Sequence, residues 1–66
     1  MTYEDFRTAI ERALIEAGKP LTWSDIKQRA GLPQKVPNNK WVRQMEIDIG
    51  LIREKGKDGR MLWRLR

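Results

Sequence analysis

The sequence has no cysteine and no histidine, and it has only one tyrosine and one phenylalanine among its 66 residues. Without cysteine there is no disulfide framework and no thiolate chemistry, which fits a reducing compartment. Without histidine the chain lacks the commonest metal ligand and general base. No apolar run approaches the length of a membrane span, and no signal-peptide core is visible. We therefore expect a cytoplasmic protein with no metal, no cofactor and no membrane partner.

The sequence also lacks any set of residues arranged for catalysis. Thr2, Thr22 and Ser24 have no histidine to activate them, and each is better explained as a helix cap or an exposed polar residue. The acidic residues are scattered or stand in capping positions, without metal-ligand spacing. The segment Gly56–Gly59 is too short for a phosphate-binding loop and has no helix after it. We expect no enzyme activity.

Positive charge is what the chain has in excess, and it is unevenly spread. The net charge is +5 and the isoelectric point is about 10.1. Residues 1–18 hold four acids and two bases, a net charge of −2, whereas residues 19–66 hold twelve bases and five acids, a net charge of +7. This asymmetry indicates a polyanionic partner on one side of the molecule, although a merely soluble basic domain has the same composition.

Two helices are predicted in the first half of the chain. The first covers Tyr3–Ala17, with Thr2 as its cap and an apolar residue at every third or fourth position. The second begins after Thr22 and ends at Gly31, a residue that commonly stops helices. Its Trp23 shares a face with other apolar residues, so we expect it in the core rather than as a stacking platform.

A stiff connection and a hairpin flank the third helix. In the connection, Leu32 and Val36 are expected to fill the space between the second and third helices, and Gln34 and Lys35 to remain exposed. After Gly50 the pattern alternates, which predicts strands over Leu51–Lys55 and Arg60–Arg66. In the last strand the residues expected to face the helices are Met61, Trp63 and Leu65. Leu21 is a candidate for a very short strand beside this hairpin.

The third helix is predicted over Asn38–Ile49, and its two sides differ in composition. Its core side has Val42, Met45 and Ile49, with Trp41 at the edge. Its outward face has Asn39, Lys40, Arg43, Gln44 and Ile47. Amides and cations on one face of a short helix suit base edges and phosphates, although most surface helices also have a charged, solvated face. An exposed Ile47 suits either a thymine methyl group or a second protein chain.

The shared apolar stripes predict one core for the single domain 1–66. Its expected members are Phe6, Ile10, Leu14, Ile26, Val42, Met45, Ile49, Trp63 and Leu65.

The order of helix, brief strand, helix, turn, helix and hairpin resembles the winged helix-turn-helix family over the whole chain. The resemblance lies in Leu21–Ile26 entering the second helix, in Gly50–Ile52 leaving the third, and in the basic hairpin turn Lys55–Arg60. It implies an α+β fold with three helices and a C-terminal two-stranded β-hairpin wing, in the form of small archaeal and bacterial regulators. Two departures are a longer turn with two prolines and no extra helix after the last strand, so we expect a monomer or a weak homodimer.

The family resemblance implies binding of double-stranded DNA, with the third helix in the major groove and the wing on the adjacent backbone or in the minor groove. A transcriptional regulator or a repeat-binding protein would fit this role. The candidate nucleic-acid-binding residues are Ser24, Lys27, Gln34, Lys35, Asn39, Lys40, Arg43, Gln44, Ile47, Lys55, Lys57 and Arg60. The alternatives are RNA binding, or a protein-interaction domain with Ile47 and Leu62 as exposed anchors.

Overall fold

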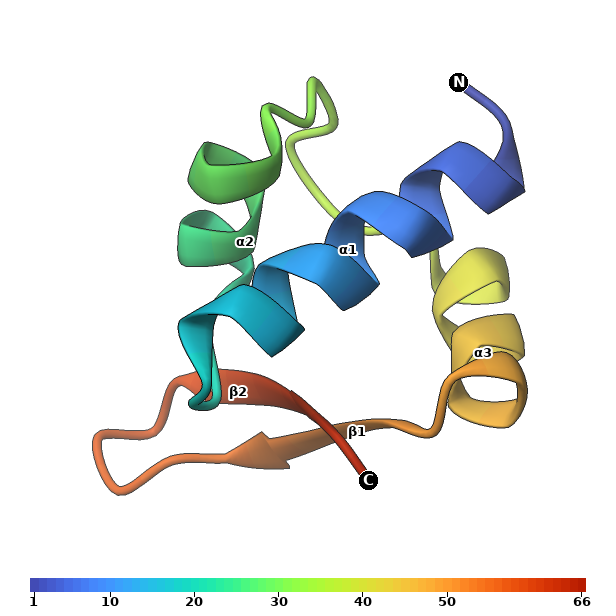
Figure 1. Cartoon of the computed structure of the whole chain (residues 1–66). Coiled ribbons are helices and arrows are strands. Elements are labelled where there is room, and N and C mark those ends of the chain that lie inside the picture. The colour runs from blue at the N-terminus through green and yellow to red at the C-terminus, as the bar shows by residue number, and fades with distance from the viewer.

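The computed structural model describes residues 1–66 and contains three helices followed by a two-stranded antiparallel hairpin (Figure 1). The elements are α1 (Tyr3–Ala17), α2 (Trp23–Ala30), α3 (Asn39–Asp48), β1 (Leu51–Lys55) and β2 (Met61–Leu65). This is the predicted α+β fold, with the layout of a winged helix. In Figure 1, α1 crosses between α2 and α3, and the hairpin lies along one end of the three helices. None of the helices is both long enough and apolar enough to span a membrane.

Side-chain caps explain why each helix begins where it does. Thr2 accepts a hydrogen bond from the Asp5 amide at 3.1 Å, and Thr22 accepts one from the Asp25 amide at 3.2 Å. Asn38 caps α3 by accepting from the Trp41 amide at 3.2 Å. Each cap satisfies an amide that has no partner within the helix, so the predicted starting points are confirmed.

The transition from α3 to β1 depends on Gly50. Ile49 is the C-cap of α3, and Gly50 follows with φ = +69°. Residues with a side chain adopt this left-handed conformation only at a cost in free energy. The Gly50 carbonyl accepts a hydrogen bond from the Arg66 amide at 2.8 Å, so the start of β1 is tied to the end of the chain. A Cβ atom at Gly50 would lie 3.0 Å from the Cβ atom of Arg66, so a larger residue at this position would have to displace Arg66.

The sheet is built on β2, which pairs on both of its edges. β1 and β2 are antiparallel, and their register runs from the Leu51–Leu65 pair to the Lys55–Met61 pair. On the other edge Leu21 forms a single antiparallel bridge with Trp63, with N···O distances of 2.9 and 2.7 Å. Leu21 therefore lies beside the hairpin as predicted, but as a single bridge rather than a strand, and β1 is left as an outer strand.

One apolar cluster holds the helices and the hairpin together, and seven of the nine predicted core residues are buried in it. The cluster consists of Phe6, Ile10, Leu14, Leu21, Ile26, Leu32, Val42, Met45, Leu51 and Trp63. The two other predicted members, Ile49 and Leu65, are half-buried at its margin, because each stands at the end of its element. Trp23 also packs against the cluster, as expected.

Three apolar side chains are placed differently from the prediction. Val36 is 73% exposed rather than packed between α2 and α3, whereas Leu32 of the same connection is buried. Met61 is 45% exposed, since it begins β2 at the hairpin turn, away from the core. Leu62 is half-buried rather than exposed, and its side chain lies over Gly56 at the base of the turn.

Candidate nucleic-acid interface

The outward face of α3 is open to solvent along its whole length. Every residue predicted for this face is exposed, namely Asn39, Lys40, Arg43, Gln44 and Ile47. Ile47 is 79% exposed, the highest value among the chain's exposed large apolar residues. Neither Lys40 nor Arg43 forms an ion pair within the chain. The face therefore offers free cationic and amide donors beside one apolar side chain.

Aromatic packing fixes α3 against α1 on the opposite side. The ring of Trp41 lies 5.2 Å from that of Phe6, measured between centroids, and 5.9 Å from that of Tyr3 in an edge-to-face arrangement. Such pairs contribute beyond their buried area. Because Trp41 contacts two rings of α1, this side of α3 is turned toward α1, and the outward face is turned away from it.

A polar network at Asp48 secures the other end of α3. The Tyr3 hydroxyl donates to one carboxylate oxygen of Asp48 at 2.6 Å, and Arg7 lies 3.6 Å from the same oxygen. The Gln44 amide donates to the second oxygen at 3.0 Å. The Tyr3 hydroxyl first and the Gln44 amide second hold the pKa of Asp48 below its ordinary value, and burial raises the pKa of Tyr3. Asp48 thus stays charged and joins Tyr3 and Arg7 of α1, at one oxygen, to Gln44 of the outward face at the other.

The same network orients one predicted base-reading residue. One N–H of the Gln44 side chain is occupied by Asp48, which leaves its second N–H and its carbonyl oxygen free. One donor and one acceptor are what a glutamine needs to pair with the edge of adenine in the major groove. The bond to Asp48 is therefore compatible with the predicted role of Gln44.

The wing tip, residues Lys55 to Arg60, carries less free charge than its composition indicates. Arg60 is paired with Asp58, with its Nε atom 2.6 Å from a carboxylate oxygen. The Arg60 backbone amide also donates to Asp58 and is the main reason that the pKa of Asp58 is lowered. Lys55 and Lys57 are exposed and form no ion pair.

The structure separates the wing tip from the outward face of α3. The hairpin turn lies at the end of β1 opposite to α3 (Figure 1). Five strand residues span roughly 17 Å, so the two predicted contact regions are not parts of one compact site. A single partner must be long enough to follow β1 if it is to contact both.

The remaining predicted residues divide between exposed and inward-turned positions. Ser24 is exposed and Lys27 is half-buried, and with Leu32 they line a shallow depression of about 320 Å³ on α2. Lys35 is exposed, and its carbonyl accepts a hydrogen bond from the Trp23 indole at 2.9 Å. The exposure predicted for Gln34 is wrong. Its amide carbonyl oxygen is buried without a partner, and its nitrogen lies 3.4 Å from the Met1 sulfur, because the N-terminal segment covers this side of the connection.

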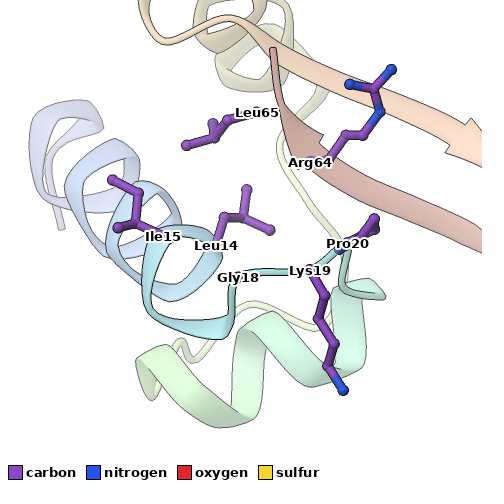
Figure 2. Close-up of a pocket in the computed structure, with 7 residues that line it drawn as sticks. All are labelled: Leu14, Ile15, Gly18, Lys19, Pro20, Arg64 and Leu65. Carbon is purple, nitrogen blue, oxygen red and sulfur yellow. The ribbon is translucent and has the colours of Figure 1, made fainter.

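Figure 2 shows a pocket of about 380 Å³ between the end of α1 and β2. Its walls include Leu14, Ile15 and Leu65, whereas the charged ends of Lys19 and Arg64 point out of it. Arg64 is instead paired with Glu54 at 2.7 Å. Small-molecule sites combine apolar walls with a few converging polar groups, and this pocket has only the walls. No cluster of acidic residues in the chain is arranged to hold a metal ion.

Sequence reasoning missed one cation whose placement is unusual. Arg53, in the middle of β1, is half-buried and lies over the ring of Trp63. The alternation of β1 places Arg53 on the same face as the buried Leu51. This shared face could have predicted from the sequence that Arg53 lies beside the core. Only three of the chain's fourteen basic residues form ion pairs, and Arg53 is among those that do not.

Comparisons of the chain with protein-family models, with curated proteins and with solved structures found no match.

Proposed function

We propose that this chain is a winged helix-turn-helix domain that binds double-stranded DNA, with α3 in the major groove. The observation that carries the proposal is the outward face of α3, where Lys40 and Arg43 are exposed without ion-pair partners and the exposed Gln44 amide keeps one donor and its acceptor free. A major groove about 12 Å wide admits an α-helix and displays a different donor and acceptor pattern for each base pair. The packing of Trp41 and the network at Asp48 orient this face before any ligand binds.

Within this proposal the residues take two kinds of role. Lys40, Arg43 and Gln44 approach base edges, and Arg43 has the fork of donors that bonds guanine at two positions. The phosphate contacts come from Ser24, Lys27, Lys35, Lys55 and Lys57. Arg60 contributes less than these lysines, since Asp58 already neutralises part of its charge.

The unpaired cations predict how binding responds to salt. Each phosphate that a lysine or arginine neutralises releases condensed counterions, so the logarithm of the binding constant falls linearly with that of the salt concentration. A slope of the size expected for several phosphate contacts would agree with the unpaired cations on α3, the connection and the wing.

Selection from a random duplex pool, followed by a salt titration on the selected duplex, tests the proposal. We expect one enriched site and a steep loss of affinity with added salt. An RNA hairpin and a single-stranded DNA serve as competitors in the same titration. Stronger binding to the RNA hairpin would replace DNA by RNA as the partner, and no salt-dependent binding to any nucleic acid would refute the proposal.

A second function is favoured by one observation, the 79% exposure of Ile47. An apolar side chain so open to water on a packed helix suits a protein partner as well as a thymine methyl group. The half-buried Leu62 does not form a second anchor beside it. Binding of a partner protein that is insensitive to salt and is abolished by Ile47→Glu would favour this alternative.

A further inference from the structure

Arg53 is a cation that the fold holds in place without giving it an anion. Its guanidinium carbon lies 5.5 Å from the centre of the Trp63 ring, and its Nε atom is buried without a hydrogen-bond partner. The side chain forms none of the chain's ion pairs. Buried donors normally have partners, because an unmade hydrogen bond costs free energy. The terminal nitrogens of Arg53 also form no hydrogen bond within the chain, and they are not among its buried unpartnered atoms, so they are available to a ligand.

The surface on which Arg53 lies is a stack of two indole rings. Arg53 stands directly opposite Trp63 in the sheet, and Trp63 stacks on Trp23 with ring centroids 5.3 Å apart and planes inclined by 26°. The Trp23 indole donates in turn to the Lys35 carbonyl, which ties this stack to the connection between α2 and α3. An arginine lying on an indole loses less freedom on binding than a lysine on a flexible turn.

The nearest acidic residue in the sequence is directed elsewhere. Strand alternation places Arg53 and Lys55 on the face of β1 that carries Leu51, and Glu54 on the other face. Glu54 is paired with Arg64 across the hairpin at 2.7 Å. Arg53 and Lys55 therefore form a cationic row on one face of the outer strand, with no carboxylate bound to either.

Arg53 lies between the two regions that the proposed function assigns to DNA, the outward face of α3 and the wing tip. β1 starts next to the end of α3 and ends at the wing tip (Figure 1), and Arg53 is its middle residue. A nucleic acid that contacts both α3 and the wing tip must pass along this strand. The phosphate chain of such a ligand would meet Arg53 before it meets the lysines of the turn.

We propose that Arg53 binds a backbone phosphate of the nucleic acid, and that Trp63 and Trp23 hold its guanidinium in position for this contact. The proposal rests on the proposed function and adds to it a fixed phosphate contact between α3 and the wing tip. Arginine suits the role because its planar fork bonds two phosphate oxygens at once. The contact is independent of base sequence, so it sets how the protein lies along the duplex.

The test compares Arg53→Met with Arg64→Met. Both changes remove one positive charge from the hairpin, but Arg64 lies on the opposite face and is already paired with Glu54. We expect Arg53→Met to weaken binding about tenfold on the selected and on a scrambled duplex alike, as loss of one charged hydrogen bond predicts. The salt slope should fall by about 0.9, the value for one lost phosphate contact. Arg64→Met should leave the slope unchanged.

A measurement on the wild-type protein tests the proposal even if Arg53→Met does not fold. The Nε–Hε resonance of Arg53 is followed by NMR while the selected duplex, and separately inorganic phosphate, is added. We expect the duplex to shift this resonance at lower concentration than inorganic phosphate does. A shift with inorganic phosphate alone would make this a small-anion site and would overturn the proposal.

The failure of this inference is distinct from that of the proposed function. If Arg53→Met folds and binds as the wild type does, while substitution of Arg43 weakens duplex binding, Arg53 is not a phosphate contact and the function stands. If the wild-type protein binds no duplex at all, the function itself fails.

Discussion

Replacing Trp63 by alanine is the substitution expected to cost this fold most. Trp63 is only 1% exposed, forms the bridge with Leu21, and stacks on Trp23. An indole that buries roughly 200 Å² contributes roughly 5 kcal/mol at 25 cal/mol per Å². Measured losses for tryptophan-to-alanine changes in cores are about 3–5 kcal/mol. A domain of this length is stable by only about 3–10 kcal/mol, so Trp63→Ala should remove much or all of its stability.

Urea and thermal unfolding, followed by circular dichroism, measure this loss. A shift of about 4–8 °C per kcal/mol predicts that Trp63→Ala lowers the melting temperature by more than about 12 °C. Met61→Ala is the matched control, because Met61 lies on the same face of β2 but is 45% exposed. Its cost should stay below about 1 kcal/mol. If Trp63→Ala melts within a few degrees of the wild type, the packing of β2 on the helices is wrong.

Three further predictions address the C-terminal end of α3 and the wing. The lowered pKa of Asp48 stabilises the fold above the pKa that this carboxyl has in the unfolded chain, and the stabilisation is lost as the pH falls through the folded pKa. Asp48→Asn should therefore lose less stability on acidification than the wild type does. Melting curves between neutral and acid pH measure this difference. Gly50→Ala should cost more stability than Gly18→Ala in urea unfolding, because both have positive φ but only Gly50 faces a Cβ atom, that of Arg66, at 3.0 Å. Replacing the three wing-tip cations by alanine should weaken binding to every duplex alike and flatten the salt slope by about 0.9 for each lost phosphate contact; a loss confined to one site would contradict a sequence-independent wing.

The helices and strands follow from local chemistry that the sequence displays directly. Thr2, Thr22 and Asn38 are capping residues, and a single amide hydrogen bond to each determines where a helix begins. The alternation of apolar and polar residues predicted β1 over its observed residues, because successive side chains of a strand point to opposite faces and only one face lies on the core.

The candidate site was less predictable, because it depends on contacts between distant residues. Periodicity identified the outward face of α3, but it could not show that Asp48 is held by Tyr3, which lies 45 positions away. Gln34 was expected to be exposed, and only the folded position of Met1 explains why it is turned inward. Arg53 was missed because its significance comes from Trp63 on the neighbouring strand.

The affinity of Arg43→Ala for the selected and for a scrambled duplex, at one salt concentration, tests the central claim most directly. Arg43 is exposed, so the variant should fold as the wild type does. We predict a loss of about 1–3 kcal/mol on the selected duplex, with relaxed choice at one base pair and a smaller loss on the scrambled duplex. Arg12→Ala, which removes an exposed and unpaired cation from α1, controls for the change in net charge. Equal losses on both duplexes, or no loss on either, would contradict the claim that α3 reads base pairs.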